Sequence, residues 1–252
     1  MPGPTPVTVA VRRIAGRDLP CRAARALVAR PAESGDAAYP VVAFGHGFLQ
    51  RPWRYRSLLT RIAAAGYLVV APGGQSGPLP RHGRLADDLR RALDWARRAQ
   101  PGAGHVPAAL VGHSMGAGAA LLAATAGPDV AAVVAMSALD TRPSCRAGLA
   151  GIAVPVRYVV GSLDTVVPPS RSRDLYAASP PTAEWANIQG GGHCGFLDST
   201  FPRGFGCGGA TLDRAVQVEL AARLIVDWLD RACRGAEAGP APDGVLLEAR
   251  AP

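Results

Sequence analysis

Short apolar runs alternate with segments of helical periodicity from about residue 40 onward. The runs are rich in Val and bounded by Gly or Pro, which is typical of strands buried on both faces of a parallel sheet. They predict strands at residues 39–44, 67–72, 108–113, 131–136 and 156–162, with a weaker one at 183–190. Residues 7–14 and 24–30 are weaker candidates for an antiparallel edge.

The segments between these runs carry the stripe of an amphipathic helix. Leu85, Leu89 and Leu93 recur on one face with Arg opposite, and the same spacing returns at 212–229. Further helices are expected at about 55–65 and from 115 to about 125. Strand–helix alternation of this kind gives a doubly wound α/β fold with a mostly parallel sheet and helices on both faces.

The distribution of these elements predicts one domain over residues 1–235. The short segment 137–151 leaves no room for a cap domain between two strands, so we expect a site that is open to solvent. Residues 236–252 are rich in Gly, Pro and Ala, and we expect a loosely held tail there.

The bulk composition indicates a globular chain, with 48% hydrophobic and 18% charged residues. No apolar run is long enough for a transmembrane helix. The first twenty residues lack the apolar core of a signal peptide. We therefore expect a cytoplasmic monomer without a membrane span, or a secreted protein if Met1 stands in place of a removed leader.

The net charge of +8 comes from 27 basic residues, all of them Arg. One interpretation is an anion-binding face for nucleic acid, a membrane surface or an acidic substrate. The Arg residues are spread along the chain, and no nucleic-acid motif accompanies them. This distribution favours a compositional bias of the source genome, and we expect no nucleic-acid partner. The lack of Lys excludes a Ser–Lys dyad and a Schiff base.

Five cysteines occur without a C-x-x-C pair, which argues against zinc-ribbon and thioredoxin sites. Cys194 and Cys207 bracket a Gly- and Phe-rich stretch and could close a disulfide. A bridge would suit an oxidising compartment, whereas the odd total, which includes Cys21, suits a reducing one. The residues leave both alternatives open, and they predict neither a metal site nor a cofactor.

The segment ALVGHSMGAGAA, residues 109–120, places Ser114 between Gly112 and Gly116 directly after a predicted strand. Small residues there allow a helix to pack closely on a sheet. The pattern G-x-S-x-G also describes a strand–turn–helix elbow that presents a nucleophilic serine. The elbow is a hypothesis whose partners have to be found elsewhere in the chain.

Candidate partners for the serine lie further along the chain, each in a segment that follows a predicted strand. Asp164 comes directly after the strand ending at Ser162, where its carboxylate can accept a hydrogen bond from an imidazole. A helix cap is the alternative role, for which Ser170 is better placed, and Asp140 is the rival acid. His193 lies in the flexible loop GGGHCGF, whereas His46, His82, His105 and His113 fit the role less well.

The stretch AFGHGFLQ, residues 43–50, follows the first central strand. Its glycines let the chain turn sharply, so the backbone N–H groups of Phe48 and Met115 are the expected oxyanion donors. Core packing is the alternative role for each apolar residue nearby. The expected substrate contacts are Leu49, Trp53, Val166, Val167 and Phe196, together with the side chains of Phe48 and Met115.

Three segments carry a family resemblance: YPVVAFGHGF, LLTRIAAAGYLVVAP and LVGHSMGAGAALLAA. With them the chain resembles the α/β-hydrolase superfamily over about residues 37–232, in the branch of chlorophyllases, dienelactone hydrolases and cutinase-like polyester hydrolases. Dienelactone hydrolases use a cysteine nucleophile where this chain has Ser114. The resemblance implies the α/β-hydrolase fold and a serine carboxylic ester hydrolase with Ser114, Asp164 and His193 as its triad.

The expected substrates are small-molecule or polymeric esters, ranging from small or medium to bulky ones and including polyesters. An amidase, thioesterase or acyltransferase could use the same triad. A binding protein with this fold and no catalysis is an alternative of a different class. Comparative rates on a matched ester, thioester and amide separate these interpretations.

Overall fold

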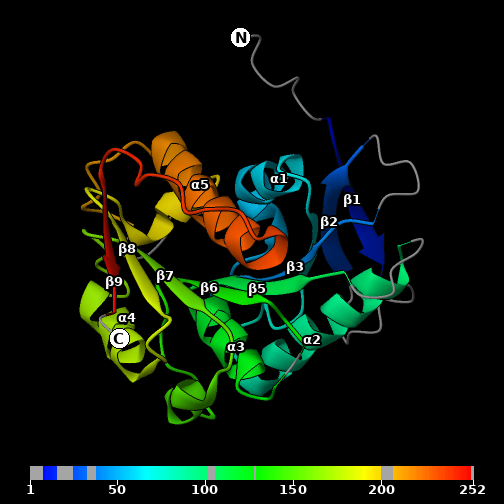
Figure 1. The fold of residues 1–252 in the computed structure, drawn as a ribbon, viewed down its shortest axis with the longest axis horizontal. Coiled ribbons are helices and arrows are strands. Elements are labelled where there is room, and N and C mark those ends of the chain that lie inside the picture. Colours follow the sequence, from blue (N-terminus) through cyan, green and yellow to red (C-terminus); the bar gives the residue numbers. More distant parts are fainter. Residues whose placement is uncertain are drawn as a thin grey trace.

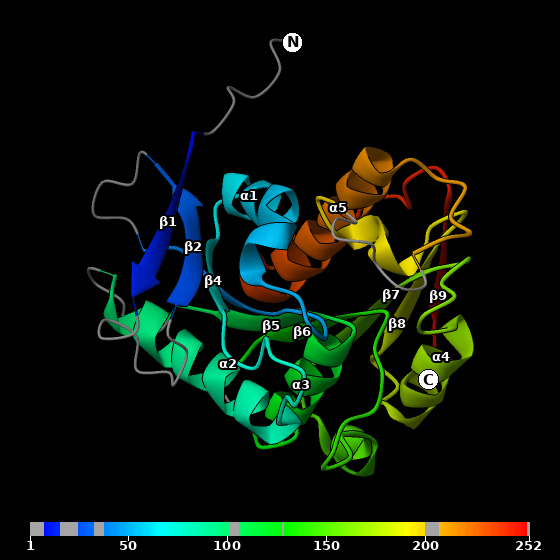
Figure 2. The same cartoon turned by 180° about the vertical axis from the view of Figure 1, so that it is seen from behind.

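The computed structural model describes residues 8–15, 25–32, 38–100, 106–127, 129–199 and 207–250. These residues form a nine-stranded sheet in the order β1-β2-β4-β3-β5-β6-β7-β8-β9, with helices on both faces (Figures 1 and 2). The six central strands, β4, β3, β5, β6, β7 and β8 in sheet order, pair in parallel with one another. Strands β1, β2 and β9 are antiparallel: β1 pairs with β2, β2 with β4, and β9 with β8. The doubly wound, mostly parallel sheet predicted from the sequence is confirmed.

The strands lie close to the predicted runs. Their bounds are β1 (Val9–Ala15), β2 (Arg25–Pro31), β3 (Val41–Gly45), β4 (Leu68–Pro72), β5 (Ala108–His113), β6 (Ala132–Met136), β7 (Val156–Gly161), β8 (Glu184–Ile188) and β9 (Val245–Ala249). The helices are α1 (Arg56–Ala64), α2 (His82–Arg98), α3 (Met115–Ala124), α4 (Pro169–Ala178) and α5 (Arg214–Arg234), with short 3-10 helices η1 (Pro52–Tyr55), η2 (Arg146–Gly151) and η3 (His193–Phe196).

One apolar layer lies on each side of the sheet. Helices α1 and α5 cover one face, and α2, α3 and α4 cover the other (Figure 1). Successive residues of β3 supply both layers: Val41 and Ala43 face α2 and α3, while Val42 and Phe44 face α1 and α5. This two-sided burial explains why the central strands are continuous apolar runs instead of alternating ones.

The segment from β6 to β7 contains only η2 and forms no separate cap over the sheet. The carboxyl ends of the parallel strands therefore carry only their own loops.

The expectation of a loosely held tail at residues 236–252 is wrong for residues 245–249. These residues form β9, which pairs with β8 from Val245 opposite Ile188 to Ala249 opposite Glu184. Val245 is buried, and Gly244 reverses the chain with a φ of 78°. The tail is held by backbone hydrogen bonds to β8, a contact that its Gly- and Pro-rich composition does not reveal.

A buried ion-pair cluster connects β7 and β8 to α5. The Arg157 guanidinium, 1% exposed, donates to Glu184 at 2.7 Å and to Asp227 at 2.8 Å. It also donates to the backbone carbonyl of Leu224 and lies 4.5 Å from the centre of the Trp228 ring. One side chain thus satisfies acceptors on two elements of the core.

Replacing Arg157 by Met should lower the free energy of unfolding by about 3 kcal/mol, because Glu184 and Asp227 lose their buried partner and keep only the partly exposed Arg231. Arg157→Lys keeps the charge without the planar fork and should cost less. Urea unfolding followed by circular dichroism measures both changes. An unchanged urea midpoint for Arg157→Met would show that packing alone holds α5 to the sheet.

Candidate active site

Ser114 lies on a sharp turn between β5 and α3, with φ 56° and ψ −121°. A Cβ on Gly112 would lie 2.2 Å from the Gly116 carbonyl oxygen, and a Cβ on Gly116 would lie 2.2 Å from the Gly45 carbonyl oxygen. Glycine is therefore required at both positions for β3, β5 and α3 to meet so closely. This local geometry is that of the nucleophile elbow.

Asp164 and His193 reach Ser114 from two other strand ends. Asp164 follows β7, and His193 begins η3 after β8. The His193 Nε2 atom lies 3.1 Å from Ser114 Oγ, and its Nδ1 atom lies 2.8 Å from Asp164 Oδ2. The three side chains are buried and form one continuous hydrogen-bonded chain.

The acceptor capacity of Asp164 determines which His193 nitrogen carries the proton. An ionised carboxylate only accepts, so Nδ1–H donates to Asp164 and Nε2 is left to accept from the Ser114 hydroxyl. The other oxygen, Asp164 Oδ1, accepts from the N–H groups of Val166 and Val167 at 3.0 and 2.8 Å. Asp164 therefore holds its own loop and orients the imidazole at the same time.

The capping role considered for Ser170 is wrong, because Ser170 lies inside α4 and the residue before that helix, Pro168, makes no side-chain cap. Asp140, the rival acid, accepts from Ser144 Oγ at 2.7 Å and from the Cys145 N–H at 2.9 Å. Burial raises the pKa of Asp140, but hydrogen bonds to its carboxylate outweigh this effect and lower it. Asp140 thus stabilises its own turn.

The loop after β3 lies against the elbow. A Cβ on Gly47 would lie 3.4 Å from Ser114 Cβ, which places this backbone directly beside the serine. Among the residues that the structure describes, the N–H groups of Phe48 and Met115 donate no hydrogen bond. The N–H groups of both residues are therefore available to hydrogen-bond a bound molecule.

Tyr55 and His113 support this loop, and sequence reasoning missed both roles. The Gly47 N–H donates to the Tyr55 hydroxyl oxygen at 3.0 Å, and the hydroxyl lies 2.8 Å from His113 Nδ1. The His113 ring is 4.6 Å from that of His193. Burial and the neighbouring His193 lower the pKa of His113 well below its usual range, so His113 is a neutral partner. The contact joins residues 58 positions apart, and no local motif indicates it.

The other histidines lie away from the hydrogen-bonded chain. His46 is buried between the carbonyls of Gly47 and Gly74, at 2.9 and 2.8 Å, and burial lowers its pKa. His82 Nδ1 accepts from the backbone N–H of Arg142. His105 and Cys21 lie outside the described residues.

The expected substrate contacts divide into exposed and buried residues. Phe48, Leu49 and Val166 are 47%, 53% and 41% exposed, and Trp53 is half-buried. Phe196 is fully buried against His113, and Val167 is buried beside Asp164. The expectation is therefore wrong for Phe196 and Val167, whose apolar side chains belong to the core. Met115 is also buried, which leaves its backbone N–H as its contribution to the site.

A disulfide bond joins Cys194 to Cys207, with the Cα atoms 5.3 Å apart. Cys194 directly follows His193, so the bridge connects the histidine loop to the segment that precedes α5. In the described part of the chain, Cys145 and Cys233 are free thiols, and burial raises their pKa values to about 12 and about 11. Neither thiol is suited to act as a nucleophile.

The described residues contain no cluster of metal-ligating side chains. No helix among them is long and apolar enough to cross a membrane.

Two comparisons with known proteins agree with this geometry. The family described as serine aminopeptidase, S33 (Hydrolase_4), matches residues 36–144, a range that includes Ser114 and ends before Asp164. Chlorophyllase-1 of Arabidopsis thaliana is 38% identical over 88 residues, which are 31% of this chain and 26% of that protein. The chain thus covers about a quarter of this relative. The matched segments and the sheet show the α/β-hydrolase fold, with distant homology to chlorophyllase-1.

Proposed function

We propose that the protein is a serine carboxylic ester hydrolase in which Ser114 is the nucleophile, His193 the general base and Asp164 the residue that orients the histidine. One observation carries the proposal: the unbroken chain of hydrogen bonds from Asp164 through His193 to a serine on a nucleophile elbow. The same constellation performs acyl transfer on unrelated folds, so its geometry is specific for this chemistry.

The reaction begins when the Ser114 oxygen attacks the ester carbonyl carbon and His193 Nε2 takes the serine proton. The carbonyl oxygen becomes an oxyanion, which the N–H groups of Phe48 and Met115 stabilise. His193 then returns its proton to the alcohol oxygen as the C–O bond breaks. A water molecule, deprotonated by His193, attacks the acyl-enzyme, and the acid leaves as Ser114 regains its proton.

The surroundings of the proposed site favour esters of varied size. No cap formed by the described residues covers this edge of the sheet, and Phe48, Leu49 and Val166 expose apolar surface on the loops after β3 and β7. Apolar acyl or alcohol groups gain free energy by covering such surface. Bulky or polymeric esters can approach it without a domain movement.

Amide hydrolysis is the second candidate, because the matching family is described as a serine aminopeptidase. The same triad can attack the carbonyl carbon of an ester or of an amide. Whether the enzyme is an esterase or an amidase depends on how well the site holds and protonates the leaving alcohol or amine. Ester hydrolysis remains our primary proposal, since the relative with 38% identity is a chlorophyllase and the exposed residues near the site are apolar.

The test combines covalent labelling with matched substrates. A fluorophosphonate should add to Ser114, identified by mass spectrometry of its peptide, and denatured protein should remain unlabelled. Three derivatives of butyric acid serve as matched substrates: the p-nitrophenyl ester, the thiophenyl ester and the p-nitroanilide. The initial rate should be higher on the ester than on the anilide. Hydrolysis of the anilide alone would replace the esterase proposal with an amidase. Labelling and turnover that are both absent would indicate a binding protein.

A further inference from the structure

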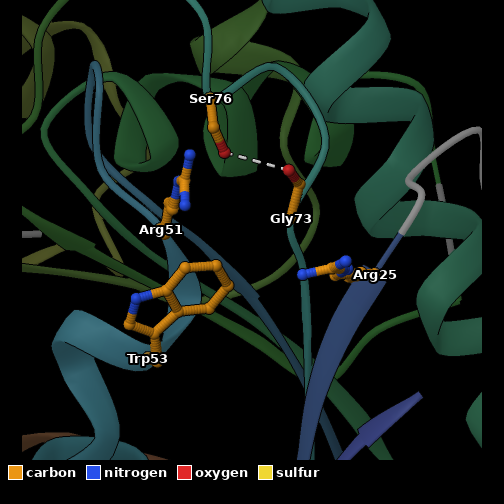
Figure 3. A pocket seen from close by; sticks show the side chains of 5 residues that line it. All are labelled: Arg25, Arg51, Trp53, Gly73 and Ser76. Atoms are coloured by element: carbon orange, nitrogen blue, oxygen red, sulfur yellow. Dashed lines mark hydrogen bonds between the residues drawn. The ribbon is translucent and has the colours of Figure 1, made fainter. Parts of the chain in front are cut away.

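A cavity of about 360 Å³ lies at the edge of the sheet beside the loop after β3. Figure 3 shows its lining: Arg25, Arg51, Trp53, Gly73 and Ser76 surround a common space. Arg25 begins β2, Trp53 lies in η1, and Gly73 and Ser76 follow β4. The cavity thus combines two cations and an aromatic ring from three separate parts of the chain.

The arginines at this cavity have no acidic partner among the described residues. Neither Arg25 nor Arg51 makes an ion pair there, although Arg residues elsewhere, such as Arg61 and Arg173, do. The carbon atom Cζ of Arg51 lies 5.2 Å from the centre of the Trp53 ring, and that of Arg13 lies 4.8 Å from it. A guanidinium stacked on an indole keeps its N–H edge free for a carboxylate.

The walls of the cavity are attached to the backbone that flanks Ser114. On one side, Ser76 Oγ lies 3.3 Å and the Gly74 carbonyl oxygen 2.8 Å from His46 Nε2, and His46 precedes Gly47. On the other side, η1 carries Tyr55, whose hydroxyl accepts from the Gly47 N–H. The cavity and the proposed oxyanion hole therefore share one loop.

The geometry points to a subsite for the anionic end of the substrate: Arg25 and Arg51 bind a carboxylate, while Trp53 covers the apolar chain leading to the ester. The inference rests on the proposed function and adds a substrate class, half-esters of dicarboxylic acids. An Arg–carboxylate contact is charge-assisted and often bidentate, so it selects the acid over its neutral analogue. This site accounts for part of an Arg content that seemed purely compositional.

The experiment compares substrates that differ only in the distal charge: mono-p-nitrophenyl adipate and suberate against their methyl-capped diesters. For the wild-type protein, kcat/KM should favour the acid about fivefold or more in at least one pair. Arg51→Gln and Arg25→Gln should each reduce that ratio about fivefold while leaving the rate on the capped ester unchanged. Arg223→Gln, which removes an exposed charge on α5, is the matched control and should preserve the ratio.

The outcomes test the anionic subsite and the esterase proposal separately. A wild-type ratio of one for both pairs, or a ratio that neither variant changes, overturns the anionic subsite and leaves the esterase proposal intact. Equal losses on the acid and the capped ester also overturn it, because the arginine would then shape the site without recognising charge. Absence of hydrolysis on all four substrates contradicts the proposed function itself. Thermal unfolding of each variant verifies that it is folded.

Discussion

Replacing Ser114 by Ala should lower kcat on p-nitrophenyl butyrate by about 10⁵-fold or more. The substitution removes the only atom of this side chain that can form the acyl-enzyme, whereas the backbone N–H groups at Phe48 and Met115 remain. The residual rate should therefore stay above the uncatalysed one, because binding and oxyanion stabilisation persist. Initial rates on acetate, butyrate, octanoate and laurate esters measure the loss and also give the acyl preference.

Ser137→Ala is a matched control for this experiment. Ser137 is also buried and follows the adjacent strand β6, but its hydroxyl has no hydrogen-bond partner among the described residues. Its removal should change kcat by less than about threefold, within the range of ordinary packing effects. Equal rates for the Ser114 variant and the wild type would show that another group performs the hydrolysis.

Replacing Asp164 by Asn should lower kcat by about 10⁴-fold. The amide oxygen would keep the position that accepts from Val166 and Val167, which directs the NH₂ group at His193 Nδ1. The imidazole would then accept at Nδ1 and carry its proton on Nε2, where it cannot take the proton of Ser114. The structure should be retained, because the loop hydrogen bonds survive.

The rival acid provides the control for Asp164. Asp140→Asn leaves the hydrogen-bonded chain of Ser114, His193 and Asp164 untouched and should keep kcat within about threefold, although it should weaken the turn that ends at Arg146. The pH profile of kcat/KM for both variants separates a tautomer effect from unfolding. A larger loss for Asp140→Asn than for Asp164→Asn would reverse the two assignments.

The sequence predicted the central strands within a few residues, because two-sided burial makes each one a recognisable apolar run. It failed for β9. Residues 245–249 are five positions between Gly and Arg, and their extended conformation depends on hydrogen bonds to β8, which is 57 or more residues away in the chain. Local composition indicated only that a regular element was improbable there.

Some residues of the candidate site could likewise be predicted from the sequence, and others could not. Ser114, Asp164 and His193 could be proposed from their order, since each follows a strand whose carboxyl end lies at one edge of the sheet. Tyr55 and the cavity lined by Arg25 and Arg51 could not, because both depend on contacts between distant segments. Phe196 shows a further limit: the sequence gives its apolar character but not whether the ring faces solvent or core.

The backbone of Ser114 has a consequence for the evolution of the protein. A φ of 56° is unfavourable for a residue with a Cβ and costs on the order of 1–3 kcal/mol, whereas glycine adopts such angles with little strain. Selection for stability alone would thus favour glycine at this position. The proposed function accounts for a hydroxyl-bearing side chain at a position where thermodynamic preference favours glycine, so stabilised variants should retain Ser114 and carry their substitutions elsewhere.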